Sequence, residues 1–154
     1  SEQMRGFCDA VIARAQAGSR IAWAPNDLKE VPGRFDAVIC HNVLHLLPPA
    51  EQEDFLKQLC ARVGPGGVLV ISGFSEEPGA DIELWQAIAR ARFHAQGMDS
   101  ETIERVMASR NAGVYSVDAD RLAGQLHRAG MEPATQLLQA LFNRLWFSRR
   151  PAAQ

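Results

Sequence analysis

The period of apolar residues changes several times between residues 34 and 74. Residues 36–40 form a short apolar run with two β-branched side chains, which is typical of a strand buried on both faces. In residues 51–63 the apolar side chains recur every three to four positions, which predicts an amphipathic helix. Residues 64–67 (GPGG) end that helix, and residues 68–71 form a second buried strand. The pattern therefore predicts a parallel βαβ unit with a right-handed crossover.

The residues before this unit predict one helix and one strand. Apolar residues follow helical spacing from Met4 to Ala15, and Gly18 ends the segment. Residues 20–24 are expected to form a short strand, which a turn at residues 25–27 ends.

The residues after the unit are predicted to be mostly helical. Three helical patterns occupy about residues 81–130. Their candidate N-caps are Asp81 for the first helix, Asp99 or Ser100 for the second, and Ser116 or Asp118 for the third. Residues 137–150 predict an antiparallel hairpin with a tight turn near Asn143. The three tryptophans fall on apolar positions, which favours core packing for Trp23, Trp85 and Trp146.

Composition restricts the class of protein. The chain has 154 residues, enough for one domain with a core and too few for two ordinary ones. A net charge of −2 gives no general attraction to nucleic acid or to an anionic membrane. Three cysteines without a Cys-x-x-Cys pair argue against a zinc site and a disulfide scaffold, and favour a reduced, cytoplasmic setting. No apolar run approaches the roughly 20 residues of a membrane span, and no signal peptide is visible.

Polar residues gather where the two strands of the βαβ unit end. Cys40 ends the first strand, His41, Asn42 and His45 follow it, and Ser72 follows the second. In open α/β sheets, ligands bind in the crevice beyond the carboxyl ends of the strands. The sequence therefore predicts a binding site at this edge.

The run FDAVICHNVLHLL, followed by LxxxVGPGGVLVIS at this spacing, resembles the post-adenosine half of class I S-adenosylmethionine-dependent methyltransferases. The resemblance implies a Rossmann-like α/β fold, S-adenosylmethionine as cofactor, and cofactor contacts at Cys40 and His41. Asp27 and Leu28 resemble the acidic loop that holds the adenine in this family, where the carboxylate accepts a hydrogen bond from the exocyclic amine. The alternative is that Asp27 is only a turn residue.

The predicted helical insert at about residues 81–130, with its run FHAQGMDSETIERVMASR, resembles the carboxy-S-adenosylmethionine synthase branch, which belongs to tRNA wobble-uridine modification. That branch pairs an arginine with the extra carboxylate of its carboxylated cofactor, and Arg105 and Arg110 are the candidates here. A plain methyltransferase with a similar insert explains the sequence equally well. No basic stripe with interleaved aromatic residues is present, so binding of tRNA would rest on the resemblance alone.

Two motifs of the superfamily are absent, namely the glycine-rich loop after the first strand and the acidic residue that holds the ribose. Residues 64–67 do not replace the loop, because they follow a helix and enter a strand. We therefore expect residues 1–154 to form a single partial methyltransferase domain. It would be a Rossmann-like class I fold that lacks its first two strands, with a mainly parallel sheet that ends in an antiparallel hairpin. Two hypotheses remain: the carboxyl-terminal part of a methyltransferase, or a non-catalytic interaction module derived from that fold.

His45 is the candidate catalytic residue, since the ordinary pKa of histidine suits a general base at neutral pH. The alternative is a loop histidine that is hydrogen-bonded to the backbone. His41 and His45 lie four residues apart without a third ligand, so no metal site is predicted. Asn42, Arg110 and Tyr115 are candidate contacts of a small-molecule substrate; Tyr115 is the only tyrosine and lies in a loop before a helix.

The two absent strands would leave apolar surface uncovered. The strand at residues 36–40 would have an unpaired edge, and the first helix would expose Phe7, Val11 and Ile12. We therefore expect a homodimer, through edge pairing or through exchange of residues 1–24, or else direct pairing of residues 20–24 with residues 36–40.

Overall fold

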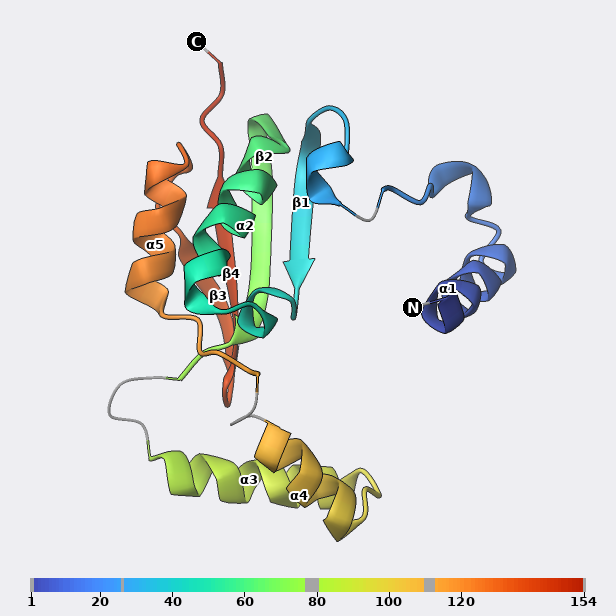
Figure 1. The fold of residues 1–154 in the computed structure, drawn as a ribbon, viewed down its shortest axis with the longest axis vertical. Coiled ribbons are helices and arrows are strands. Elements are labelled where there is room, and N and C mark those ends of the chain that lie inside the picture. The colour runs from blue at the N-terminus through green and yellow to red at the C-terminus, as the bar shows by residue number, and fades with distance from the viewer. Residues whose placement is uncertain (1, 26, 77–80, 110–112, 154) are drawn as a thin grey trace. The chain divides into compact units, whose positions relative to one another are not determined.

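The computed structural model describes every residue except 1, 26, 77–80, 110–112 and 154, which Figure 1 draws in grey. The chain divides into two compact units, Ser1–Pro32 and Gly33–Gln154, and each is described by itself.

The first unit contains helix α1 (Glu2–Arg14), which confirms the predicted helix, and 3-10 helices at Gly18–Arg20 and Leu28–Glu30. The strand predicted at residues 20–24 is wrong, because residues 21–25 have no regular structure.

Trp23 is not a core residue, contrary to the prediction. Its side chain is 48% exposed, its Nε1 donates to Asp9 Oδ1 at 2.7 Å, and Arg5 lies 5.0 Å from the ring centre. Since residues 21–25 form no strand, this segment has no sheet against which the indole could pack. Phe7 and Val11 of α1 are exposed, as expected, whereas Ile12 is half-buried, contrary to the prediction.

The second unit contains a sheet with some of its helices packed on one face (Figure 1). Its elements are β1 (Phe35–His41), α2 (Pro49–Ala61), β2 (Val63–Phe74), α3 (Ile82–Ala95), α4 (Ser100–Ser109), α5 (Ala119–Arg128), β3 (Thr135–Ala140) and β4 (Asn143–Arg149). The strand order is β1-β2-β4-β3, with β1 and β2 parallel and the other two pairs antiparallel. The βαβ unit and the terminal hairpin are confirmed, but the sheet is mixed rather than mainly parallel.

The GPGG segment differs from the prediction, because it lies within β2 and not before it. Val63 already pairs with Phe35, and the next pair joins Val68 to Ala37, so residues 64–67 form an irregularity in the strand. The helix ends earlier than predicted, at Ala61.

Gly67 is required by close packing of the backbone at this irregularity. A methyl group added at Gly67 would lie 2.9 Å from the carbonyl oxygen of Gly64 and 3.0 Å from those of Phe35 and Asp36. Such distances leave no room for a side chain, so the glycine allows β1 and β2 to come together here.

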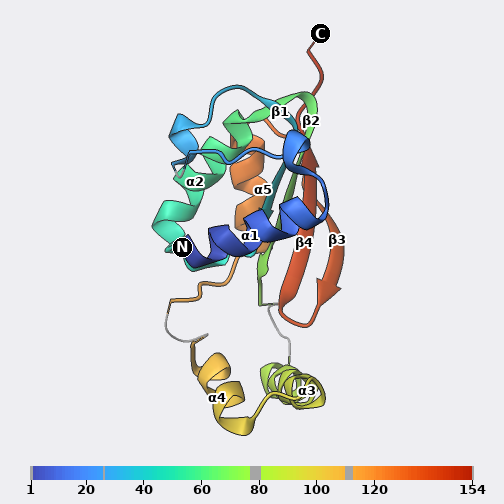
Figure 2. The same cartoon turned by 90° about the vertical axis from the view of Figure 1, so that its right-hand side faces the viewer.

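Helices α2 and α5 lie side by side on one face of the sheet (Figures 1 and 2). The core between these layers consists of Leu56, Leu59, Leu69, Ile71, Leu122, Leu126 and Trp146, all buried. Full burial of an aliphatic side chain of this size contributes about 1.5–3 kcal/mol. Trp146 therefore meets its predicted core role.

β1 lies at one edge of the sheet, as predicted. Its predicted burial on both faces is wrong, because Ile39 is 72% exposed. The outer edge of β1 pairs with no strand in the described ranges, so direct pairing with residues 20–24 is not found. The homodimer stays a prediction.

Helices α3 and α4 begin at two of the predicted caps. The Asp81 carboxylate accepts from the Leu84 amide at 2.9 Å, and the Asp99 carboxylate accepts from the Thr102 amide at 2.9 Å. Asp118 does the same for α5, accepting from the Arg121 amide at 2.6 Å.

A small apolar cluster joins α3 and α4 to the hairpin. Its buried members are Ala89, Ile103, Met107 and Phe142. The ring of Trp85 meets that of Phe142 edge-on, with centroids 5.1 Å apart, which confirms a packing role for Trp85. An ion pair between Arg90 and Glu104, 2.8 Å long, connects the two helices at the surface.

Candidate functional site

The carboxyl ends of β1 and β2 meet at one edge, as predicted, and a short hydrogen-bonded chain connects them. Asn42 Nδ2 donates to His41 Nε2 at 3.3 Å. Neutral His41 therefore carries its proton on Nδ1, which donates to Ser72 Oγ at 2.5 Å. Ser72 is buried, whereas His41 and Asn42 are exposed. The edge thus presents an oriented imidazole and a carboxamide to a ligand.

Cys40 lies at the same edge, but its side chain is buried. Burial raises the pKa of the Cys40 thiol, so the thiol stays protonated near neutral pH. A protonated, buried thiol is a poor nucleophile, which leaves a contact role for this residue.

His45 is held by backbone groups on two sides. It lies in the 3-10 helix Leu44–Leu46. Its Nδ1 accepts from the Phe74 amide at 3.1 Å, and its carbonyl oxygen accepts from the Tyr115 amide at 2.7 Å. A methyl group added at Gly73 would lie 3.1 Å from Nδ1, so glycine at that position leaves room for the ring.

These contacts bear on the chemistry of His45. Burial lowers the pKa of His45, which favours the neutral imidazole. Because Nδ1 accepts a hydrogen bond, the proton of the neutral ring lies on Nε2. In this arrangement the imidazole can donate from Nε2, whereas acting as a base through Nδ1 would require it to release the Phe74 amide. The backbone-bonded alternative named from the sequence is the geometry observed.

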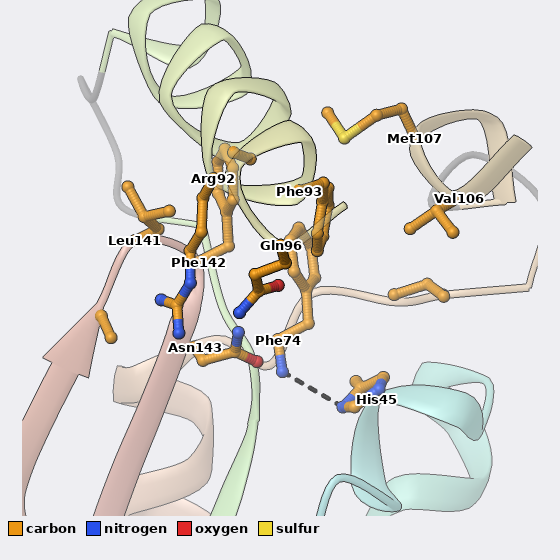
Figure 3. Close-up of a pocket in the computed structure, with 13 residues that line it drawn as sticks. His45, Phe74, Arg92, Phe93, Gln96, Val106, Met107, Leu141, Phe142 and Asn143 are labelled. Atoms are coloured by element: carbon orange, nitrogen blue, oxygen red, sulfur yellow. Dashed lines mark hydrogen bonds between the residues drawn. The ribbon is translucent and has the colours of Figure 1, made fainter. Parts of the chain in front are cut away.

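A cavity of about 470 Å³ lies beside His45 (Figure 3). Nine of its thirteen lining residues are apolar: Phe74, Ala89, Phe93, Val106, Met107, Val114, Ala140, Leu141 and Phe142. The other four are His45, Arg92, Gln96 and Asn143. An apolar wall with a few polar groups is typical of a site for a small molecule.

A second cavity, of about 300 Å³, lies at the carboxyl edge. Its lining residues are His41, Asn42, Ser72, Leu138, Ala140, Asn143, Arg144 and Leu145. Ala140 and Asn143 line both cavities, so the two adjoin at the turn of the hairpin.

The remaining candidate residues from the sequence do not line either cavity, or lie outside the residues that the structure describes. The Asp27 carboxylate accepts from the Lys29 amide at 2.9 Å and caps the 3-10 helix Leu28–Glu30, which is the turn role named as its alternative. Tyr115 is 37% exposed and contacts His45 through its backbone amide. Arg105 pairs with Glu101 at 3.1 Å on the surface of α4. Arg110 lies outside the described residues.

Sequence reasoning missed the polar residues of the larger cavity. Ala89, Arg92, Phe93 and Gln96 follow the spacing i, i+3, i+4, i+7 on α3, which places two polar side chains on an apolar helix face. Polar side chains on an otherwise apolar helix face were the sequence feature from which this part of the cavity could have been predicted. The contribution of Asn143 depends on the tertiary fold, because it comes from the hairpin.

Within the part of the chain that the structure describes, no three His, Cys, Asp or Glu side chains are grouped so that they could hold a metal ion. No helix among those residues is long and apolar enough to cross a membrane.

Comparisons with known proteins gave one family and a set of similar folds. The family described as "Methyltransferase domain" matches residues 5–136. A search of curated proteins gave no match.

Three solved structures illustrate the similarity. An O-methyltransferase family protein from Burkholderia thailandensis is 18% identical, with a TM-score of 0.69, over 97% of this chain and 42% of that chain. The S-adenosylmethionine-dependent methyltransferase SibL in its apo form is 14% identical, with a TM-score of 0.67, over 93% and 39%. Magnesium protoporphyrin IX methyltransferase (ChlM) from Synechocystis PCC 6803 with bound SAH is 16% identical, with a TM-score of 0.51, over 90% and 57%. The TM-scores show a shared fold, and the chain spans less than two thirds of each of these three proteins.

Proposed function

The chain belongs to the methyltransferase domain family, and from this premise we propose that it forms the substrate-side part of an S-adenosylmethionine-dependent methyltransferase that acts on a small molecule. The observation that carries the proposal is the pair of adjoining cavities, one at the carboxyl edge of the sheet and one beside His45. A transfer reaction needs two neighbouring sites of this kind, one for the donor and one for the acceptor.

The cavity at the carboxyl edge has the character of a cofactor site. Its His41, Asn42 and Ser72 end two parallel strands, where open α/β sheets bind their ligands. S-adenosylmethionine, when bound, would supply an electrophilic methyl group. In this proposal His41 and the neighbouring Cys40 line the adenosine. Asp27 and Leu28 remain proposed contacts of the adenine, on the family resemblance alone.

The larger cavity would hold the methyl acceptor. In this proposal its apolar wall packs against the acceptor and its few polar groups orient it, so that positioning supplies most of the rate enhancement. Asn42, which lines the adjoining carboxyl-edge cavity, is proposed as a substrate contact, together with Tyr115 and Arg110. His45 either donates from Nε2 to the acceptor or, after releasing the Phe74 amide, removes its proton.

Titration of the 15N-labelled chain with S-adenosylhomocysteine, followed by NMR, tests the cofactor site. We expect weak binding, since the glycine-rich loop is absent, with the largest shifts at the His41, Asn42 and Ser72 amides. In a protein that also carries the glycine-rich loop, Asp27→Ala should weaken binding by about 1.5–3 kcal/mol through loss of a charge-assisted hydrogen bond. Asp54→Ala is the matched control, because Asp54 is an exposed acid on α2 that pairs with Lys57.

Two outcomes would count against this proposal. An absence of shifts at the carboxyl edge at millimolar ligand would contradict the cofactor site. An equal loss of affinity in Asp27→Ala and Asp54→Ala would return Asp27 to a turn residue. Micromolar binding would instead contradict the expectation that the methionine and ribose pocket is incomplete.

We also propose that the exposed edge of β1 pairs with a second copy of the chain. The exposure of Ile39 beside an edge without a described partner strand supports this, since such an edge is a template for another strand. Light scattering behind a sizing column would detect the homodimer. A monodisperse monomer would contradict it.

A further inference from the structure

We propose that the cavity beside His45 binds a ring-containing molecule with one carboxylate, and that Arg92 pairs with this carboxylate. The inference names the class of methyl acceptor and in that sense rests on the proposed function, but the binding it describes does not depend on the cofactor.

Size and aromatic content favour a planar ring. A volume of about 470 Å³ falls in the range of small-ligand pockets. Three phenylalanines line the cavity, and the rings of Phe74 and Phe142 lie 5.6 Å apart at 37°. Aromatic pairs favour such offset or tilted contacts, and a bound ring would extend the arrangement.

The charge of the lining favours an anion. Arg92 is the cation among the described lining residues, which include no Asp or Glu. His45 adds no second positive charge, because burial lowers the pKa of His45 and favours its neutral form. A ligand that carries one negative charge would therefore neutralise the cavity.

Arg92 differs from its neighbouring arginines in its contacts. Arg90 pairs with Glu104, and Arg105 pairs with Glu101. The Arg92 guanidinium makes no hydrogen bond or ion pair with the residues that the structure describes. A guanidinium can bind a carboxylate through two parallel hydrogen bonds, so this side chain is suited to the ligand.

Two carboxamides accompany the guanidinium. Figure 3 shows the polar ends of Arg92, Gln96 and Asn143 gathered on one side of the cavity, with the phenylalanine rings nearby. Each carboxamide offers an N–H group that can donate to a carboxylate oxygen. The cavity thus combines a polar end for the acid with an apolar part for the ring.

The test compares three probes with the same ring: 2-naphthoate, 2-naphthylmethanol and 2-naphthyl phosphate. Calorimetric titration of the full 154-residue chain should show 2-naphthoate binding at least about tenfold more tightly than the neutral alcohol, a factor that corresponds to 1.4 kcal/mol. Arg92→Gln should remove this preference and leave the affinity for the alcohol unchanged. Arg105→Gln, which removes a surface charge outside the lining, should keep the preference.

A second variant keeps the test decisive if Arg92→Gln fails to fold. Gln96→Glu places a carboxylate beside Arg92, and it should reduce binding of 2-naphthoate while 2-naphthylmethanol binds as before. Equal affinity of the acid and the alcohol in the unmodified chain would overturn the proposal, as would a preference that survives both substitutions. Tighter binding of the phosphate than of the carboxylate would overturn it in favour of a phosphate ester.

The outcome can be separated from that of the proposed function. The cavity lies entirely within Gly33–Gln154, and its probes are read by heat without methyl transfer. Discrimination of the acid without any shift from S-adenosylhomocysteine would support the acid site and count against the cofactor site. The reverse pattern would overturn the acid site alone.

Discussion

The sheet with α2 and α5, and the pair of helices α3 and α4, differ in how completely they bury their apolar residues. In the first region Leu56, Leu69 and Leu122 are at most 1% exposed. In the second, Leu84 and Ile88 are 53% and 44% exposed. We therefore expect the first region to contribute most of the free energy of unfolding. The second region lines an open cavity and buries fewer of its apolar side chains.

This difference has a consequence for motion. Segments with few buried apolar contacts open at a lower free energy than the core does. We expect α3 and α4 to exchange their amide hydrogens faster than α2, α5 and the strands. A site with such a wall can admit ligands of different size, while the carboxyl edge of the sheet stays fixed.

The largest effect should come from removing core volume in the sheet. Leu69→Ala leaves a cavity under α2 and α5 and should lower the free energy of unfolding by about 2–5 kcal/mol. Urea unfolding followed by circular dichroism measures this loss. Val106→Ala, at a 37% exposed position of α4, is the comparison and should cost far less. Equal losses in the two variants would remove the distinction between the regions.

The second effect tests the close approach of β1 and β2. Gly67→Ala forces a methyl group against three carbonyl oxygens and should destabilise the fold by about 1–3 kcal/mol. Gly97 follows α3 with φ +82° and has open space around it, so Gly97→Ala introduces only backbone strain, of roughly 1–2 kcal/mol. We expect Gly67→Ala to lower the urea midpoint of the whole chain, and Gly97→Ala to act on α3 and α4 alone. A whole-chain effect of Gly97→Ala would contradict this.

Features that depend on short-range sequence patterns could be predicted, whereas those that need a tertiary partner could not. The βαβ unit, the hairpin and the caps at Asp81, Asp99 and Asp118 depend on short-range patterns, and these predictions are confirmed. Residues 20–24 have the local composition of a strand, but they pair with no strand among the described residues and do not form one. Propensity alone does not stabilise a strand.

The candidate site likewise has a part that was predictable from local sequence and a part that depends on tertiary packing. The meeting of His41 with Ser72 was predictable, because the carboxyl ends of parallel strands share an edge. The polar end of the larger cavity was not, because Arg92 comes from α3 and Asn143 from the hairpin. Their convergence depends on packing around Phe142, which no local pattern specifies.

The third effect compares two helix caps. Asp118→Ala and Asp81→Ala each remove a carboxylate that accepts from a first-turn amide, which typically costs about 1 kcal/mol. Asp118 caps a core helix, so its loss should lower the urea midpoint. Asp81 caps α3, so its loss should raise hydrogen exchange in α3 and leave the midpoint nearly unchanged. Two equal midpoint shifts would show that the helices unfold as one unit.

The smallest effect is a dependence on pH at the point where the two regions meet. His45 lines the cavity, and its Nδ1 accepts from the Phe74 amide of β2. Burial lowers the pKa of His45 in the folded chain, while the unfolded chain keeps the ordinary value of about 6.5. The unfolded state therefore binds the proton more readily, and the free energy of unfolding falls as the pH drops below about 6.5 towards the lowered value. It is recovered in full above that window.

Protonation of Nδ1 also removes the acceptor of the Phe74 amide, so we expect a loss of at most about 1 kcal/mol, the net contribution of one neutral hydrogen bond. Urea midpoints at pH 5.5 and 7.5 measure this loss. His45→Gln should flatten the difference, whereas His127→Gln, at an exposed position of α5, should retain the share due to His45. If His45→Gln keeps the full acid sensitivity, the imidazole is not the titrating group, and the hydrogen bond to Phe74 does not connect the cavity to the stability of the sheet.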